Sequence, residues 1–200
     1  MLAILSAIAL SALLTPLDGP PVLNSPVFSL ATLNADGSTN MQILTYATPV
    51  GVAPRTWAIS LYRPTRSHAN FAARKTGVLQ LLTTDHAKLM HLLGGQSGAD
   101  VDKEALCAEA GFRWLDAPPD LADDAWVGGG PQLLPGCACY LRLVQVGEMT
   151  PCGEHDATIC RVEGMLDGVG DGAGFDAALS TAVCRGLGLI TDRGKAIPPE

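Results

Sequence analysis

The order of the strand-forming segments constrains the fold of this chain more than any other feature. β-branched and aromatic residues gather in several short runs, and the first two runs flank Asp36-Gly37, a pair typical of a hairpin turn. Strands are predicted at 26–34, 40–48, 55–62, 77–84, 139–150 and 157–166. Short helices are predicted at 68–75, 85–94, 102–110 and 174–190. Strands and helices do not alternate regularly, so the pattern favours a mainly β barrel with peripheral helices over a doubly wound parallel sheet.

Length and composition fit one folded domain with short appendages. The chain has 200 residues, of which 48% are hydrophobic, and a formal net charge of −7. Such a chain can bury a sizeable core. Its acidity argues against nucleic acid as a partner, because nucleic-acid binders present a basic face. We expect an apolar N-terminal segment at 1–24, one domain at 25–192 and a tail at 193–200.

The first residues, MLAILSAIALSALLTP, are apolar and precede the first charged side chain, Asp18. The run is too short to span a bilayer as a helix, so no membrane span is predicted. It also lacks the positive start of a secretory signal. Two interpretations stay open: a helix packed on the body or on a partner subunit, and an uncleaved or truncated targeting segment.

Positive charge is concentrated in one part of the chain. Five of the 13 Lys and Arg residues fall between residues 55 and 75, around the stretch SLYRPTRSHANF at 60–71. Two arginines, two hydroxyls and a histidine there precede a predicted helix, whose first turn offers unpaired N–H groups to an anion. The stretch indicates a phosphate site. The alternative is an ordinary solvated loop with Ser67 as the helix N-cap.

The six cysteines have no standard metal-site spacing. A zinc site could be drawn from Cys137, Cys139, Cys152, His155 and Cys160, but no pair of CxxC knuckles is present. We interpret most of these cysteines as small buried hydrophobic residues in a reducing compartment, and predict no metal site. The expected location is therefore intracellular, either cytoplasmic or organellar.

Three segments together resemble a known family. They are NMQILTYATPVGVAPRTWAISLYRPTRSHANFAARKTGVLQLL at 40–82, GEHDATICRVEG at 153–164 and STAVCRGLGLI at 180–190. Their order is similar to that of the flavin reductase-like, FMN-binding split β-barrel family, over about residues 26–190. The resemblance implies a mainly β split barrel with short peripheral helices, FMN as cofactor, and a homodimer with FMN near its interface.

The resemblance also implies roles for individual residues. The isoalloxazine ring would lie against the end of one strand, and the FMN phosphate against the stretch that opens the helix. His155 would lie near the open face of the flavin as the candidate catalytic residue, although an ordinary turn histidine is an equal alternative. The residues implied to bind FMN are Thr45, Tyr46, Ala47, Thr48, Leu61, Tyr62, Arg63, Thr65, Arg66, Ser67, His68 and Lys75.

The function implied is that of an oxidoreductase in which NAD(P)H reduces flavin, or a small acceptor, through bound FMN. Because flavin chemistry takes place on the cofactor itself, a catalytic triad or carboxylate pair is not needed. One alternative is a non-catalytic FMN-binding module for storage, sensing or scaffolding. Another is a structural protein centred on zinc or thiols.

Overall fold

The computed structural model describes residues 18, 21–122, 129–170 and 173–198. Most of the predicted apolar segment 1–24 therefore lies outside the described residues, as does part of the predicted loop at 115–136.

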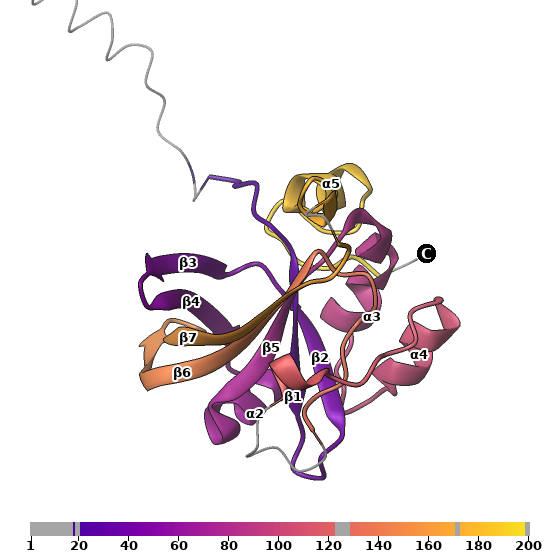
Figure 1. Cartoon of the computed structure of the whole chain (residues 1–200). Coiled ribbons are helices and arrows are strands. Elements are labelled where there is room, and N and C mark those ends of the chain that lie inside the picture. Colours follow the sequence, from indigo (N-terminus) through magenta and orange to yellow (C-terminus); the bar gives the residue numbers. More distant parts are fainter. Residues whose placement is uncertain (1–17, 19–20, 123–128, 171–172, 199–200) are drawn as a thin grey trace, which may run out of the picture.

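Seven antiparallel strands form one strongly curved sheet (Figure 1). Their spatial order is β2-β1-β5-β6-β7-β4-β3, so the first and last strands of the sheet are joined by the short link between β2 and β3. The strands are β1 (Phe28–Leu33), β2 (Thr39–Leu44), β3 (Ala47–Val52), β4 (Arg55–Tyr62), β5 (Thr76–Leu81), β6 (Cys139–Cys152) and β7 (His155–Asp167). This arrangement confirms the predicted mainly β split barrel.

Alternation along the central strands builds two hydrophobic cores. In β1 every residue is buried, with Phe28 and Leu30 in one core and Ala31 and Leu33 in the other. Successive side chains of a strand point to opposite faces, which explains the division. The first core lies inside the curved sheet and contains Phe71. The second lies under the helices that follow β5.

Four short α-helices lie around the sheet in the described part of the chain (Figure 1). Helix α2 packs on β1 and closes the inner core with Phe71, and α3 packs on β2. The helices are α2 (Arg66–Arg74), α3 (Met90–Gly94), α4 (Lys103–Glu109) and α5 (Thr181–Gly186). Three 3-10 helices lie at Thr84–Leu89, Pro119–Leu121 and Ala173–Phe175. Within the described residues no helix has the length and apolar character needed to cross a membrane.

Three local predictions differ from the structure. The strand predicted at 40–48 is interrupted at Thr45 and Tyr46, and β3 begins at Ala47 and pairs with β4 instead of β1. Pro49 lacks an N–H group, and it is tolerated because β3 is an edge strand. The helix predicted at 68–75 begins two residues earlier, at Arg66, and ends at Arg74, with Lys75 as its C-cap at a positive φ. The last helix is shorter than predicted, since only Thr181–Gly186 is α-helical within 174–190.

Candidate functional site

A cavity of about 400 Å³, called here the central cavity, lies where the ends of β2 and β4 meet the start of α2. It is lined by the β2–β3 link, by Tyr62 and the α2 N-terminus, and by residues 93–98 at the end of α3 and in the loop that follows it. Register explains the convergence: the last residue of β4, Tyr62, pairs with the first of β7, His155. The predicted site residues that line this cavity are Thr45, Tyr46, Tyr62, Thr65, Arg66, Ser67 and His155.

The N-terminus of α2 is capped by Thr65. Its hydroxyl accepts a hydrogen bond from His68 N at 3.2 Å and donates one to Tyr62 O at 2.8 Å. Thr65, and not Ser67, is therefore the N-cap residue. The first N–H groups of a helix have no partner inside it, and this cap satisfies only that of His68. The N–H groups of Arg66 and Ser67 have no hydrogen-bond acceptor among the described residues.

Two side chains at this helix end differ in their environment. Ser67 is buried, and its Oγ accepts a hydrogen bond from Asn40 Nδ2 at 2.7 Å. Arg66 is exposed and has no ion pair or side-chain hydrogen bond with another described residue. Its guanidinium is thus a positive charge on the cavity wall without an ion pair among the described residues.

His155 lies among aromatic rings. Its imidazole contacts Tyr46 and Tyr62, with ring centroids 5.4 and 5.3 Å apart. Both tyrosines are substantially exposed, and all three residues line the central cavity. The backbone fixes this arrangement, because Tyr46 O accepts a hydrogen bond from Ser60 N on β4. The result is a partly exposed aromatic surface that consists of two tyrosine rings and the His155 imidazole.

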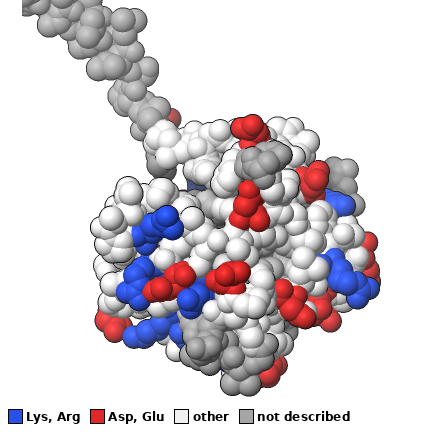
Figure 2. Space-filling view, viewed as in Figure 1, with Lys and Arg blue, Asp and Glu red and all other residues white. Residues whose placement is uncertain are grey.

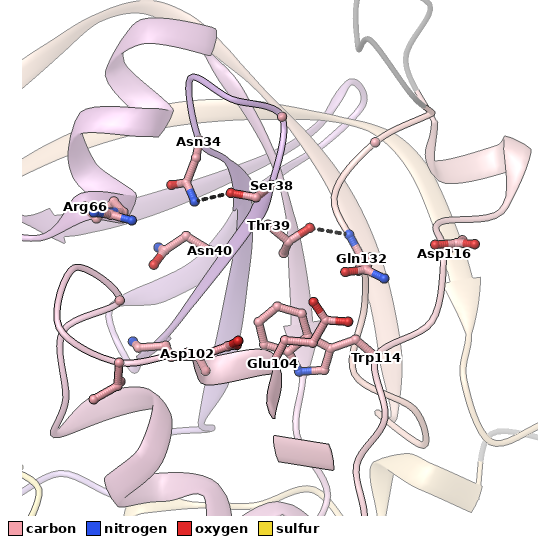
Figure 3. A pocket seen from close by; sticks show the side chains of 15 residues that line it. Asn34, Ser38, Thr39, Asn40, Arg66, Asp102, Glu104, Trp114, Asp116 and Gln132 are labelled. Atoms are coloured by element: carbon pink, nitrogen blue, oxygen red, sulfur yellow. Dashed lines mark hydrogen bonds between the residues drawn. The ribbon is translucent and has the colours of Figure 1, made fainter. Parts of the chain in front are cut away.

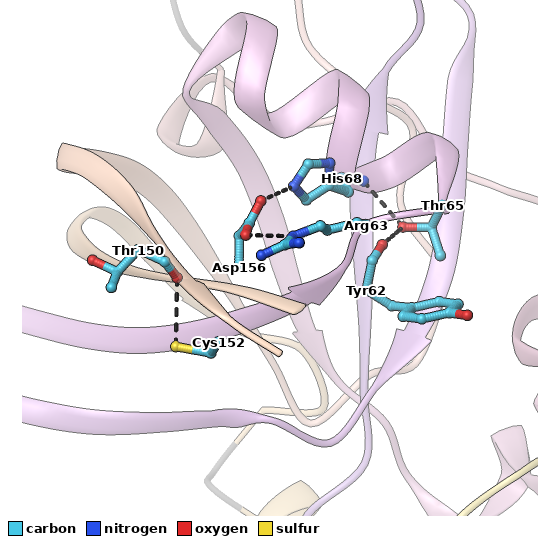
Figure 4. Close-up of polar contacts among 7 residues, drawn as sticks. All are labelled: Tyr62, Arg63, Thr65, His68, Thr150, Cys152 and Asp156. Carbon is cyan, nitrogen blue, oxygen red and sulfur yellow. Dashed lines mark hydrogen bonds and ion pairs between the residues drawn. The ribbon is translucent and has the colours of Figure 1, made fainter. Parts of the chain in front are cut away.

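Arg63 and His68 do not line the cavity but bind Asp156 (Figure 4). Arg63 Nε lies 2.7 Å from Asp156 Oδ1, and His68 Nε2 lies 2.7 Å from Asp156 Oδ2. The hydrogen bond from Arg63, followed by that from His68, lowers the pKa of Asp156. These two side chains therefore already have an acidic partner within the protein.

The remaining predicted residues lie elsewhere. Leu61 is buried in the inner core, and Ala47 and Thr48 lie on edge strand β3. Lys75 is the C-cap of α2, and its Nζ lies 3.5 Å from Glu148 Oε1.

Charges of both signs alternate on the face that carries β6 and β7 (Figure 2).

Several residues of the cavity wall were not predicted, and Lys103 is the most informative. It is 6% exposed, and its Nζ donates to Met41 O at 2.8 Å and Leu93 O at 2.9 Å. Burial lowers its pKa to about 8, and the positive charge of Arg66 acts in the same direction. The other unpredicted residues are Asn40, Gln42, Ile43, Leu44, Ser60, Pro64 and 93–98. The glycines in GGQSG at 94–98 were the available sequence signal for a close-packed loop.

The cysteines are thiols in the described structure. Cys107, Cys137, Cys160 and Cys184 are buried, as predicted for most of them, and burial raises the pKa of Cys160 to about 12. Among the residues that the structure describes, no group of three or more His, Cys, Asp or Glu side chains could hold a metal ion. The intracellular location stays a prediction.

Comparison with known families identifies the class of protein. The model of the flavin reductase like domain matches residues 22–176. The chain therefore belongs to the flavin reductase-like family, as the sequence motifs indicated. A comparison with curated proteins gave no match.

Solved structures share the fold at low sequence identity. Flavoredoxin from Methanosarcina acetivorans has a TM-score of 0.62 at 15% identity, covering 77% of this chain and 74% of its own. An FMN-binding protein from Thermus thermophilus has a TM-score of 0.59 at 17% identity, covering 92% and 84%. The NADH:FAD oxidoreductase SgcE6 from Streptomyces globisporus has a TM-score of 0.58 at 14% identity, covering 72% and 76%.

Proposed function

We propose that this protein is a flavin-dependent oxidoreductase in which NAD(P)H reduces FMN, or a small acceptor through FMN, in the central cavity. One observation carries the proposal: Arg66, which has no ion pair among the described residues, and the N-terminus of α2 line the same cavity as the aromatic surface around His155. A flavin mononucleotide has the matching chemistry, a dianionic phosphate at one end and a flat aromatic ring system at the other. Membership in the flavin reductase-like family supports the same conclusion.

The residues of the cavity suit the two ends of FMN differently. The phosphate would be held by the Arg66 guanidinium and the free N–H groups of Arg66 and Ser67, because arginine and helix N-termini both favour phosphate. The ring would lie near Thr45 and Tyr46, on the link between β2 and β3. Bound flavin supplies hydride transfer at its own ring, and the protein binds and orients it.

His155 is the candidate for handling a proton. An imidazole can act as a proton donor or acceptor, and the contacts with two tyrosines hold that of His155 at the cavity wall. Replacing His155 by Ala should lower the rate of NAD(P)H oxidation while FMN binding stays within about threefold of wild type, since the phosphate contacts are untouched. Equal losses in binding and rate would instead make it a residue that shapes the cavity.

The test begins with the absorption spectrum of the purified, desalted protein after addition of FMN. A retained flavin band, followed by turnover of NADH or NADPH, supports the oxidoreductase. A retained band without turnover by either nucleotide favours the alternative, a non-catalytic FMN-binding module. Absence of saturable FMN binding contradicts both.

We also infer that the protein forms a homodimer through the exposed face of the β3-β4-β7-β6 ribbon. Ile159 lies opposite Ala58 on one side and Val146 on the other, so apolar side chains form a row across three strands. Ile159 is 43% and Val146 47% exposed. Contiguous exposed apolar surface is typical of interaction sites. Light scattering should give a dimer mass for wild type and a monomer mass for Ile159→Glu; a wild-type monomer would contradict the inference.

A further inference from the structure

A buried lysine at the place where two cavities meet has no part in the proposed function. Lys103 is the first residue of α4 and lines both the central cavity and a second cavity of about 440 Å³. The second cavity, called here the hairpin cavity, lies between the β1–β2 hairpin, the start of α4 and Gln132 (Figure 3). Asn40, Arg66 and Gly98 also belong to both walls. The Lys103 side chain is therefore part of the wall that the two cavities share.

The hydrogen bonds of Lys103 match those of a neutral amine. Its Nζ donates to Met41 O at 2.8 Å and to Leu93 O at 2.9 Å, and these are its two hydrogen bonds to described residues. An ammonium has three N–H groups, so one of them has no acceptor among the described residues. An amine has two N–H groups and a lone pair. The two carbonyls thus use both N–H groups of the amine and leave its lone pair unused.

The surroundings of Lys103 also favour the neutral form. Burial lowers its pKa to about 8, and the charge of Arg66 on α2 acts in the same direction, while Cys107 on α4 acts in the opposite one. No described carboxylate lies within 4 Å of its ammonium. A lysine that is desolvated, or that lies beside another cation, is activated as a nucleophile toward carbonyl compounds. Lys103 meets both conditions.

Arg66 adds an attraction for anions to the same wall. Its guanidinium is exposed and has no ion pair among the described residues. Arginine binds carboxylates through two parallel hydrogen bonds. Glu104 and Asp116 lie across the hairpin cavity from Arg66 (Figure 3), so the far side of this cavity repels anions. A molecule that joins a carboxylate to a carbonyl group therefore matches the wall formed by Arg66 and Lys103.

We propose that Lys103 is a site of covalent modification by small oxo acids, carbonyl compounds that carry a carboxylate. The carboxylate binds Arg66, and the lone pair of the Lys103 amine forms a bond to the carbonyl carbon. The carbonyl oxygen then leaves as water. Overall, one lysine ammonium and one carbonyl compound give one iminium and one water, so no oxidant or reductant is needed. The iminium keeps one N–H group for the carbonyls of β2 and α3. The inference goes beyond the proposed function and does not depend on flavin.

The test is the order in which the lysines of the chain react. The other three, Lys75, Lys88 and Lys195, are exposed, whereas Lys103 is 6% exposed, so exposure alone would place it last. Full-length, desalted protein is incubated near neutral pH with glyoxylate and cyanoborohydride, which reduces the iminium to a stable amine. Peptide mass spectrometry gives the rate at each lysine. Lys103 should react at least about tenfold faster than each exposed lysine, because more of it is uncharged. In urea-denatured protein the four rates should agree within about threefold.

Substitution of Arg66 separates the carboxylate from the carbonyl group. Acetaldehyde is the matched neutral probe, and the ratio of the glyoxylate rate to the acetaldehyde rate at Lys103 measures the contribution of the carboxylate. Arg66→Ala should lower this ratio about tenfold, the effect of losing a hydrogen bond between charged groups. Arg63→Ala is the control, because Arg63 binds Asp156 and lines neither cavity. It should keep the ratio of wild type.

Three results would overturn the proposal. If Lys103 reacts no faster than the exposed lysines, it is a structural cation that joins β2 to α3. If its preference persists in urea, the folded wall does not cause it. If Arg66→Ala leaves the ratio unchanged, oxo acids are not the class of compound that this wall selects. None of these results bears on FMN binding, which tests the proposed function separately.

Discussion

The cations around the start of α2 form two groups that differ in their partners. Arg63 and His68 both bind Asp156, so the positive charge of Arg63 is balanced within the protein. Arg66 and Lys103 line two cavities, and no described carboxylate lies within 4 Å of their charged nitrogens, although hydrogen bonds and, to a lesser extent, the charge of Arg66 lower the pKa of Asp36. In the sequence Arg63 and Arg66 look equivalent. The structure separates a pair that binds Asp156 where β4 pairs with β7 from a pair that lines the candidate site.

The largest effect expected from this difference concerns Lys103. Its pKa falls from 10.5 in a model compound to about 8 in the folded protein, mainly because of burial. The unfolded chain therefore holds this proton up to higher pH, so deprotonation favours the folded state as pH rises from 8 to 10.5. Relative to Lys103→Met, wild type should gain about 3 kcal/mol of unfolding free energy over this range. Urea denaturation of both proteins at several pH values measures it.

Two further results would test the lowered pKa of Lys103. A difference between wild type and Lys103→Met that stays constant from pH 8 to 10.5 would mean that Lys103 is solvated or paired. A bound anion should raise the pKa of Lys103. With saturating ligand, the rise in unfolding free energy should therefore begin at a higher pH.

A smaller effect is expected at the balanced group. Asp156→Asn removes the negative charge that Arg63 and His68 contact. This change should lower the midpoint of thermal unfolding at pH 7, while FMN affinity stays within about twofold of wild type. Because the pKa of Asp156 is lowered below 3.8 in the folded protein, its contribution is present above that pH and is lost as pH falls through the folded-state pKa. The stability difference between wild type and Asp156→Asn should therefore vanish in acid. A large loss of FMN affinity would instead place Asp156 in the site.

The smallest effect concerns the cap. Thr65 was predicted to contact the phosphate, but its hydroxyl already accepts from His68 N and donates to Tyr62 O. Thr65→Ala should cost about 1 kcal/mol of unfolding free energy, the usual value for a lost N-cap. Chemical denaturation measures that loss, and Thr65→Ser, which keeps the hydroxyl, is the matched control. A fall in FMN affinity larger than the fall in stability would assign Thr65 to the phosphate after all.

The sequence predicted the fold better than the site because the two depend on different kinds of information. Runs of β-forming residues and the Asp36-Gly37 turn are local, and they located six of the strand regions. The break at Thr45 and Tyr46 was missed because β-forming residues continue through it. Pairing with β4 separates the two strands, and that pairing is not a local property.

The site depends on contacts that no local pattern reveals. Arg63 and Asp156 are 93 residues apart and meet only through the register of β4 and β7. Lys103 looks like an ordinary first-turn lysine in the sequence, yet its ammonium reaches Met41 O, 62 residues away. The motifs predicted the helix at whose start the candidate site lies. They could not tell which of its cations were already paired.

The most direct measurement is an FMN titration, followed by flavin fluorescence, of wild type, Arg66→Ala, Arg63→Ala and His68→Ala. The account predicts saturable binding to wild type, with an affinity at least about tenfold lower in Arg66→Ala because a charged phosphate contact is lost. Arg63→Ala and His68→Ala should remain within about threefold of wild type, since their side chains bind Asp156. Absence of saturable binding to wild type, or a loss in His68→Ala with none in Arg66→Ala, would contradict it.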